Sequence, residues 1–302
     1  MARIVGIGAN VHDTLITLPA YPAEDTKLRA ERSMEVGGGP CGTALVAAAK
    51  LGADCAWLGQ LALDRGGDFL AADMARWGVD VSLAKRREGT SFSSWIWLSA
   101  ASATRTCVFD RGTLPPLILD PAQKEAIASA DLLLLDGNEM AAAIEGAEIA
   151  RANGVKVLLD AGGRYAGIEK LLPLVDLLIP SEEFALGITG KTSVREAARE
   201  LLRRFAPETL VITCGKEGGV ILDQKGYRSY RAYKVKAADT NGAGDVFHGA
   251  YAYAFTAGRG GADECAAFAS ACSALKCTGA GGARQSTPTL PELEKFIKEN
   301  ER

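Results

Sequence analysis

The feature that most constrains the fold is a regular alternation of short apolar runs and amphipathic stretches that begins near residue 130. The run 132–135 consists of four leucines and ends in Asp136, and a helix-like stretch follows from residue 140 to about 153. Short apolar strands that alternate with amphipathic helices are typical of a parallel sheet covered by helices on both faces. Ligands bind such sheets at the carboxyl ends of the strands. The other expected elements are strands at 155–159, before Ile179 and at 209–213, and a helix at 193–205.

Two segments depart from this alternation, residues 14–36 and residues 91–110. The first is expected to be extended, and the second is expected to form a β-hairpin. Together they predict a small β-sheet lid that projects from one α/β domain spanning residues 1–302. The details expected within the lid are a turn at 21–23, alternating polarity over 27–32, strands at 94–98 and 106–109, and a turn of small residues at 99–103.

Three aromatic residues, Trp95, Trp97 and Phe109, fall on this expected lid. Large apolar side chains that are exposed on a projecting sheet need a partner or a substrate to cover them. The lid therefore predicts a homodimer in which two copies of the chain meet through their lids.

The segment 238–250 carries the strongest chemical signal, because a Gly-Ala-Gly turn at 242–244 opens directly into an apolar helical run. Glycines let backbone N–H groups converge on an anion, and the helix N-terminus adds a partial positive charge. Asp245 has two interpretations. It caps the helix, or it accepts the proton of a hydroxyl that attacks a phosphoryl group. The second acid, Asp239, and the run of small residues favour the catalytic interpretation.

Composition excludes several other classes of protein. The formal net charge is −3 and no long basic run occurs, which argues against a nucleic-acid or membrane-surface binder. The first apolar run, residues 4–7, is too short for a signal peptide or a membrane span, so we expect a cytoplasmic protein. Seven cysteines without a CxxC pair and only two histidines argue against a zinc site and predict reduced, buried thiols.

The segment 238–250 resembles the C-terminal signature of the ribokinase-like (PfkB) carbohydrate kinases. The N-terminal signature of that family has a counterpart in residues 37–40 (Gly-Gly-Gly-Pro), which Thr43 and the stretch 47–53 follow. The resemblance implies a ribokinase-like, doubly wound and mostly parallel sheet with a small lid. It also implies that ATP with Mg²⁺ phosphorylates a small sugar.

The resemblance assigns roles to individual residues. Asp245 corresponds to the catalytic base, and Gly242, Ala243 and Gly244 correspond to the anion hole. The residues that correspond to sugar contacts are Asp13, Gly38, Gly39 and Thr43. Those that correspond to nucleotide contacts are Thr213, Gly215, Gly218, Gly242, Gly244 and Gly282, with an adenine wall from the helix 263–278 and the loop 279–282. A K⁺ ion beside Asp239 and Asn241 is common in the family and would be a further cofactor.

The sequence departs from the family pattern at two places. Thr43 stands where the family often has an asparagine that contacts the sugar. The family's Asn-x-x-Glu motif, which is associated with Mg²⁺ and phosphate, would fall on residues 181–184, where both characteristic side chains are missing. Either Glu182 or Glu183 then acts through water, or ATP itself holds most of the Mg²⁺ shell.

The branch of the family is indicated by shorter similarities. Residues 21–25 and 77–82 are similar to ketohexokinases, whereas 35–40 and 274–278 are more similar to sulfofructose kinases. A ketose is therefore the expected substrate. Four basic residues of the lid region would then face an anionic end of the substrate, or would simply lie on a solvated strand face: Lys27, Arg29, Arg105 and Arg111.

Alternative functions remain at this stage. A nucleoside kinase of the same family would use the lid aromatics to stack a base, and a sugar sensor would bind nucleotide without turnover. Residues 187–192 resemble a P-loop but lack its spacing, so they predict a helix end followed by a new N-cap. Gly6 and Gly8 lack the third glycine of a dinucleotide fingerprint, which leaves an oxidoreductase as a weak rival. His12 and His248 flank the expected site, where packing or capping is their commoner role.

Overall fold

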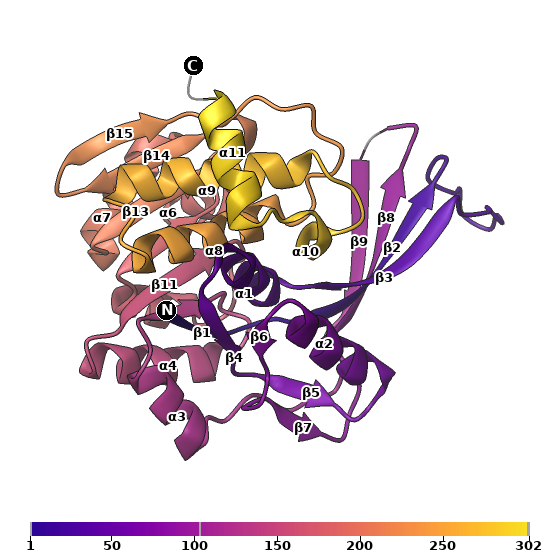
Figure 1. Cartoon of the computed structure of the whole chain (residues 1–302), viewed down its shortest axis with the longest axis horizontal. Coiled ribbons are helices and arrows are strands. Elements are labelled where there is room, and N and C mark those ends of the chain that lie inside the picture. The colour runs from indigo at the N-terminus through magenta and orange to yellow at the C-terminus, as the bar shows by residue number, and fades with distance from the viewer. Residues whose placement is uncertain (1, 103, 301–302) are drawn as a thin grey trace.

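A computed structural model describes residues 2–102 and 104–300. The body of the molecule is a nine-stranded sheet in the order β15-β14-β13-β12-β11-β10-β1-β4-β6 (Figure 1). The seven strands from β6 to β13 run parallel, and β14 and β15 add an antiparallel edge. The strands are β1 (Arg3–Ile7), β4 (Asp54–Trp57), β6 (Val79–Asp80), β10 (Leu132–Leu135), β11 (Lys156–Ala161), β12 (Leu177–Pro180), β13 (Thr209–Thr213), β14 (Gly219–Asp223) and β15 (Gly226–Tyr230).

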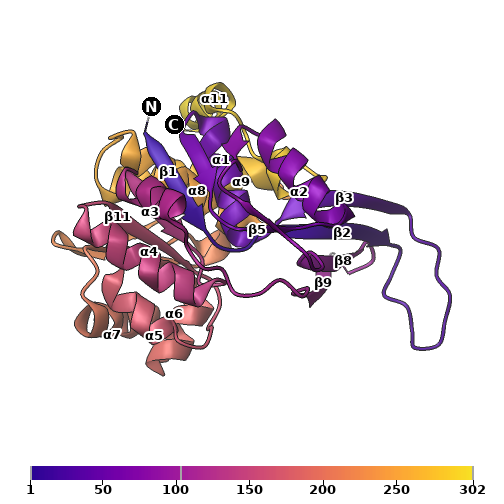
Figure 2. The same ribbon diagram turned by 90° about the horizontal axis from the view of Figure 1, so that it is seen from below.

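Alternate residues of each strand point to opposite faces of the sheet, and each face buries its own core. Leu132 and Leu134 pack with helices α1, α8, α9 and α11, whereas Leu133 and Leu135 pack with α3, α4 and α7. Figure 2 shows these two helical layers on either side of the sheet. The longer helices are α1 (Pro40–Leu51), α2 (Arg65–Arg76), α3 (Pro121–Ala128), α4 (Met140–Ala152), α6 (Glu182–Thr189), α7 (Val194–Phe205), α8 (Ala243–Thr256), α9 (Ala262–Cys277) and α11 (Leu290–Asn300).

The remaining short elements complete the body. They are α5 (Ile168–Leu171), α10 (Ala283–Ser286), two 3₁₀ turns (Leu172–Leu174 and Gly215–Glu217) and a parallel pair, β5 (Gln60–Ala62) with β7 (Lys85–Arg87), which the sequence analysis did not predict. Within the described residues, no helix is long and apolar enough to cross a bilayer. The expected α/β class and the doubly wound arrangement are thus confirmed.

The lid is a separate four-stranded sheet in the order β3-β2-β8-β9, which projects from the body (Figure 1). Its strands are β2 (Val11–Leu18), β3 (Arg32–Gly38), β8 (Ser93–Ser99) and β9 (Thr104–Asp110). The expected hairpin is present, although Ala103 at the end of its turn lies outside the described residues. The alternation expected over 27–32 was wrong, because residues 19–31 form a loop and β3 begins only at Arg32. Among the described residues, only the last residue of this loop, Glu31, donates a backbone hydrogen bond to a strand, at 2.9 Å to Thr17 O of β2.

The lid register separates its aromatic residues onto two faces. Phe109 pairs with Ser94 and so shares the face of Asp13, which is the register partner of Ser94 on β2. Trp95 and its partner Val108 lie on the opposite face, where they are 42% and 52% exposed. One face of the lid therefore looks toward the site and the other looks outward.

Two local predictions, on residues 187–192 and on the cysteines, can be compared directly with the structure. The false P-loop is the end of α6, where Gly190 adopts a left-handed φ of 67°, followed by Ser193, which caps α7. Five of the seven cysteines are buried as expected, but Cys214 is only partly buried and Cys107 on β9 is exposed. The expectation of burial was wrong for Cys107 because β9 is the edge strand of the projecting lid.

Candidate active site

The Gly-Ala-Gly turn forms the N-terminus of α8. Gly242 is the N-cap residue, with a φ of 70°, and a Cβ there would lie 2.4 Å from the Cβ of Ala283, so glycine is required on both grounds. The first N–H groups of a helix lack intrahelical acceptors and point outward. Ala243 N–H donates to Thr240 O at 3.2 Å, which leaves the amide of Gly244 as the N–H group best suited to receive an anion.

Helix α9 holds the loop that precedes this turn. Cys277 O accepts hydrogen bonds from the amides of Ala238 and Asp239, at 2.8 and 3.2 Å. Ser273 Oγ donates to Ala243 O at 2.8 Å. Lys276 Nζ donates to Asp239 O at 2.9 Å and also to the carbonyl oxygen of Asn241. The backbone conformation of the loop is therefore fixed mainly by groups of one helix.

Asp13 and Asp245 line one small cavity of about 100 Å³. Asp13 lies on β2, and its Oδ1 accepts a hydrogen bond of 2.6 Å from Ser94 Oγ on β8. A Cβ on Gly38 would lie only 1.8 Å from Asp13 Oδ2, so a glycine is needed where the two strands approach. The cavity brings together most of the residues expected to bind the sugar and to perform catalysis, namely Asp13, Gly38, Gly39, Thr43, Asn241, Gly242 and Asp245.

The environment raises the pKa of both carboxyl groups. Burial raises the pKa of Asp245 to about 7, and the nearby Asp160 carboxylate adds to this effect. Burial likewise raises the pKa of Asp13 to about 6, although its hydrogen bond from Ser94 and the charge of Arg284 oppose the rise. Asp245 keeps some access to the cavity even though protein atoms surround it. A carboxyl group with a pKa near 7 is well placed to accept a proton at neutral pH.

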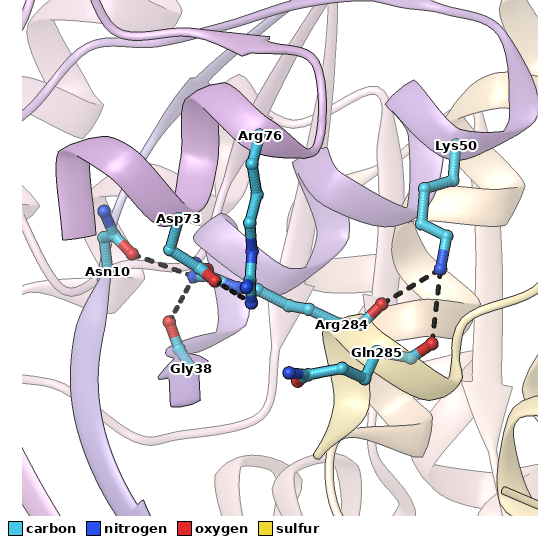
Figure 3. Close-up of polar contacts among 7 residues, drawn as sticks. All are labelled: Asn10, Gly38, Lys50, Asp73, Arg76, Arg284 and Gln285. Atoms are coloured by element: carbon cyan, nitrogen blue, oxygen red, sulfur yellow. Dashed lines mark hydrogen bonds and ion pairs between the residues drawn. The ribbon is translucent and has the colours of Figure 1, made fainter. Parts of the chain in front are cut away.

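A buried arginine supports the floor of this site (Figure 3). Arg284 is 1% exposed, and its Nη1 pairs with Asp73 at 2.6 Å. Its Nη2 donates to Gly38 O at 2.6 Å and to Asn10 Oδ1 at 2.8 Å. Arg284 therefore ties helix α2, strand β3 and the loop after β1 together directly behind Gly38.

Two buried polar atoms near the site have no hydrogen-bond partner among the described residues, Asn10 Nδ2 and Thr43 Oγ1. Thr43 belongs to the cavity of Asp13 and Asp245, whereas Asn10 lines another cavity, of about 410 Å³. Arg284 fixes the orientation of the Asn10 amide through its Oδ1, so the Nδ2 group is left as a donor. Buried polar groups are normally hydrogen-bonded, so an unpartnered hydroxyl at the cavity of Asp13 and Asp245 is suited to a ligand rich in hydroxyl groups. Thr43 can thus offer a hydroxyl where the sequence analysis noted the loss of an asparagine.

A second cavity, of about 620 Å³, lies on the other side of the α8 N-terminus. Its lining includes Thr213, Gly215 and Gly218 at the end of β13, together with Ala243 and Gly244. The far wall is built from residues 230–235 and from Ser270, Ser273, Ala274 and Cys277 of α9. Four of the six predicted nucleotide residues, Thr213, Gly215, Gly218 and Gly244, therefore line one cavity, whereas Gly242 lines the cavity of Asp13 and Asp245.

Gly282 does not join that cavity. It precedes α10 with a φ of 102°, and a Cβ there would meet Val36 and Gln285 instead. The neighbouring residues Ala280 and Gly281 line the cavity below the lid. The loop 279–282 turns toward the lid because Arg284, two residues later, must reach Asp73.

The cavity below the lid measures about 900 Å³ and contains two arginines, Arg32 and Arg105. Asp239 and Asn241 also line it. Lys27, which was expected to contact the substrate, is exposed in the loop 19–31 and is not among the residues that line this cavity. Of the four candidate cations Lys27, Arg29, Arg105 and Arg111, only Arg105 therefore lines this cavity.

The expected metal ligands do not gather at one point. Asp239 and Asn241 line the cavity under the lid, whereas Glu183 is exposed in the first turn of α6. A β-bridge between Ser181 and Thr213 does place the start of α6 beside the end of β13. Within the described part of the chain, no three His, Cys, Asp or Glu side chains form a group that could hold a metal ion. A Mg²⁺ ion bound mainly through ATP is compatible with this arrangement, because Mg²⁺ keeps several waters.

The two histidines have structural surroundings. His248 is buried, with Nε2 2.9 Å from Ile179 O and Nδ1 3.2 Å from Asp160 Oδ2. Burial lowers the pKa of His248 and raises that of Asp160 to about 8. His12 packs on Phe69 and lies 3.5 Å from Glu35. Both residues thus serve packing around the site.

Comparison with known proteins agrees with this geometry. A family model described as pfkB family carbohydrate kinase matches residues 1–290. The ribokinase of Staphylococcus aureus (strain COL) is 26% identical over 302 residues, covering 97% of this chain and 99% of that protein. A solved structure from Agrobacterium tumefaciens, provisionally described as a ribokinase, is 26% identical, with a TM-score of 0.93 over 100% of this chain and 99% of that chain.

A further solved structure, Arabidopsis thaliana ribokinase complexed with ribose and ATP, shares the fold with a TM-score of 0.88 at 23% identity, over 99% of each chain. The expected ribokinase-like architecture is confirmed by these likenesses. Because the family model matches nearly the whole length, the chain belongs to the pfkB family of carbohydrate kinases and is a phosphotransferase that acts on an alcohol group.

Proposed function

We propose that this chain transfers the γ-phosphoryl group of ATP to a primary hydroxyl of a small sugar, a ketose or a related compound. The observation that carries the proposal is that Asp13 and Asp245 share one cavity while Gly244 borders the next. An acceptor held by Asp13 and a nucleotide held beside Thr213 would meet at the N-terminus of α8. That position combines a base with an anion-binding helix end, as phosphoryl transfer to an alcohol requires.

In the proposed reaction, different residues bind the sugar, accept the proton and stabilise the negative charge. Asp13, the Gly38–Gly39 turn and the unpartnered Thr43 Oγ1 bind hydroxyl groups of the sugar and orient it. Asp245 accepts the proton of the attacking hydroxyl, and the Gly244 amide stabilises negative charge on the phosphoryl oxygens. Mg²⁺, when bound together with ATP, would neutralise charge on the phosphates. Glu182 and Glu183, at the start of α6, are the nearest acidic candidates to reach its waters.

The lid supplies the features that would select the substrate. Phe109 lies on the same lid face as Asp13, and Arg105 lines the cavity below that face. Arg105 also acts electrostatically, as the smallest of several influences, on Lys276, which supports the anion-hole loop. A ketose with a sulfonate, phosphate or carboxylate at its far end would gain a charge-assisted hydrogen bond from Arg105.

A substrate panel tests the proposal. ADP release would be measured with MgATP and ketoses, anionic ketoses, ribose and nucleosides as acceptors. Ribose belongs in the panel because a relative at 26% identity is named ribokinase. We expect ketoses to give the highest kcat/KM. A preference for ribose or for nucleosides would overturn the ketose assignment alone, whereas saturable ATP and sugar binding without any ADP release would favour a sensor.

The outward face of the lid supports a homodimer. Trp95 and Val108 are exposed there, side by side in register, and a second copy of the same face would cover both. Size-exclusion chromatography with light scattering measures the mass directly. We expect a dimer for the native chain and a larger monomer fraction for Val108→Lys, and a native monomer at all concentrations would contradict this assembly.

A further inference from the structure

The ammonium group of Lys276 lies at the place where a monovalent cation was expected. Lys276 is 0% exposed, and its Nζ donates to the carbonyl oxygens of Asp239 and Asn241. These are the two residues beside which the resemblance placed K⁺. Both carbonyls belong to the loop that leads into the Gly242–Gly244 turn.

The residues present do not fit an exchangeable K⁺ ion on this pair of carbonyls. A K⁺ ion would have to take the position that Nζ occupies, because the ammonium already lies within hydrogen-bonding distance of both oxygens. Lys276 cannot move away cheaply, since α9 packs against α8 around it and its side chain is fully buried. The ammonium ion and K⁺ are similar in charge, and carbonyl oxygens accept either.

We propose that Lys276 is a built-in cation that replaces K⁺ under the anion-hole loop, so that phosphoryl transfer by this chain does not depend on a monovalent cation. The inference rests on the proposed kinase function and names Lys276 as a positioning residue rather than a catalytic one. Its positive charge holds two carbonyl dipoles inward and thereby turns the following amides toward the phosphoryl group.

Opposing effects act on the charge of Lys276. Burial lowers its pKa and Arg105 acts in the same direction, whereas the carboxylates of Asp239 and Asp245 and the two accepting carbonyl oxygens favour the ammonium form. Cys277 O and Ser273 Oγ hold the same loop by neutral hydrogen bonds. The loop therefore has a structural tether without Lys276, and the distinct contribution of Lys276 is charge.

The test varies the salt and the side chain together. Turnover with MgATP and the best acceptor would be measured in tetramethylammonium, potassium and ammonium chlorides at constant ionic strength. We expect the native chain to be equally active in all three. Lys276→Ala should lose activity by about 10- to 100-fold in tetramethylammonium, as expected for lost charge-assisted hydrogen bonds, and should regain most of it in potassium or ammonium. Lys276→Met, which fills the space, should lose activity and not regain it.

Lys50 offers a matched control (Figure 3). Its Nζ also donates to two backbone carbonyls, Arg284 O at 3.1 Å and Gln285 O at 3.4 Å, but these lie on α10 rather than on the anion-hole loop. Lys50→Ala should have the same rate in every salt, whatever that rate is. A native enzyme that needs K⁺, or a Lys276→Ala enzyme that no small cation restores, would overturn the proposal.

A second readout keeps this inference separate from the proposed function. A cation that binds only the native state raises the unfolding temperature. We expect potassium to raise the Tm of Lys276→Ala above its value in tetramethylammonium, with no such difference for the native chain or Lys276→Met. If the native chain releases no ADP with any acceptor, the proposed function fails while this thermal result still decides the role of Lys276.

Discussion

Asp13 and Asp245, which lie far apart in the sequence, line one cavity, where burial raises the pKa of Asp13 and the charge of Asp245 adds a smaller contribution. This relationship joins the lid to the helix that follows the Gly-Ala-Gly turn. It exists because β2 begins at Val11, soon after the carboxyl end of β1 at Ile7, while the N-terminus of α8 lines the same cavity as Thr213 at the carboxyl end of β13. An acceptor held by the first carboxylate would thus be presented to the second.

The rate should depend on pH through these two groups. Asp245 can accept a proton only when it is ionised, and its pKa is raised to about 7. We therefore expect kcat/KM to rise with pH from 5 to 8 and to be half-maximal near 7, with a further loss below pH 6 as Asp13 becomes protonated. Initial rates in buffers of constant ionic strength measure this profile. A flat profile over that range would show that neither raised pKa governs turnover.

Substitutions in the Gly-Ala-Gly turn should separate catalysis from folding. Gly244 has open space around its Cβ position, so Gly244→Val should fold normally and lose most of its activity by crowding the phosphoryl group. Gly242→Ala should instead unfold at a lower temperature, because of its left-handed φ and the clash with Ala283, with a cost of about 1–3 kcal/mol. Melting curves and ADP release measure both. An active Gly244→Val enzyme would contradict the assignment of the Gly244 amide.

Arg284 should matter for both stability and sugar binding. Arg284→Met leaves Asp73 buried with only its contact to Arg76, and we expect a loss of about 3–5 kcal/mol in the free energy of unfolding. Combining it with Asp73→Leu should recover part of that loss, since both charges are then removed. The folded Arg284→Met protein should also show a raised KM for the sugar, because Gly38, which lines the sugar cavity, loses its hydrogen bond from Arg284. If the losses in the free energy of unfolding caused by Arg284→Met and by Asp73→Leu simply add in the double variant, the energetic coupling of the two residues is contradicted.

We expect Arg105, rather than Lys27, to bind the anionic end of the substrate. Arg105 lines the cavity below the lid, whereas Lys27 is exposed in the loop 19–31. We expect Arg105→Gln to raise KM about 10-fold for a ketose that carries a sulfonate or phosphate, and much less for fructose. Lys27→Gln is the matched control and should raise neither KM appreciably. Equal effects of Arg105→Gln on the two ketoses would remove the anionic-end proposal.

Local patterns in the sequence were enough to predict much of the fold. The leucine run 132–135 is a strand buried on both faces, and helix α4 follows it. Both were predictable because a short apolar run bounded by polar residues indicates a buried strand and the longer stretch after it indicates a helix. The lid was placed correctly as an isolated sheet because its two segments break the strand-helix alternation. The error over residues 27–32 arose because alternating polarity also occurs in loops, and only a neighbouring strand makes it a β-strand.

The candidate site was predicted less completely. Asp13, Gly38, Gly39, Thr43 and Asp245 were found through motifs and do line one cavity. Arg284 was missed because a single arginine after a glycine loop looks like a surface residue, and only the fold shows that Gly37 and Gly42 leave room for its guanidinium group. Lys276 was missed for the same reason, since a lysine in the last turn of a helix is usually exposed.

The competing interpretation, in which Asp245 caps helix α8, predicts the opposite effect of Asp245→Asn on the melting temperature. The folded-state pKa of Asp245 is raised to about 7, above its unfolded value near 4, so ionisation in the folded protein costs stability as pH rises between those values. Asp245→Asn, which cannot ionise, should therefore melt at the same or a higher temperature than the native chain at pH 8. A helix cap would instead lower the melting temperature on substitution.

The central claim is that Asp245 is the catalytic base, and the turnover of Asp245→Asn tests it most directly. ADP release would be measured with saturating MgATP and sugar, alongside ATP affinity by calorimetry. We predict that turnover falls by about 10²- to 10⁴-fold, the usual contribution of a general base, while ATP affinity and melting temperature are retained. Near-normal turnover in a folded Asp245→Asn protein would contradict the account.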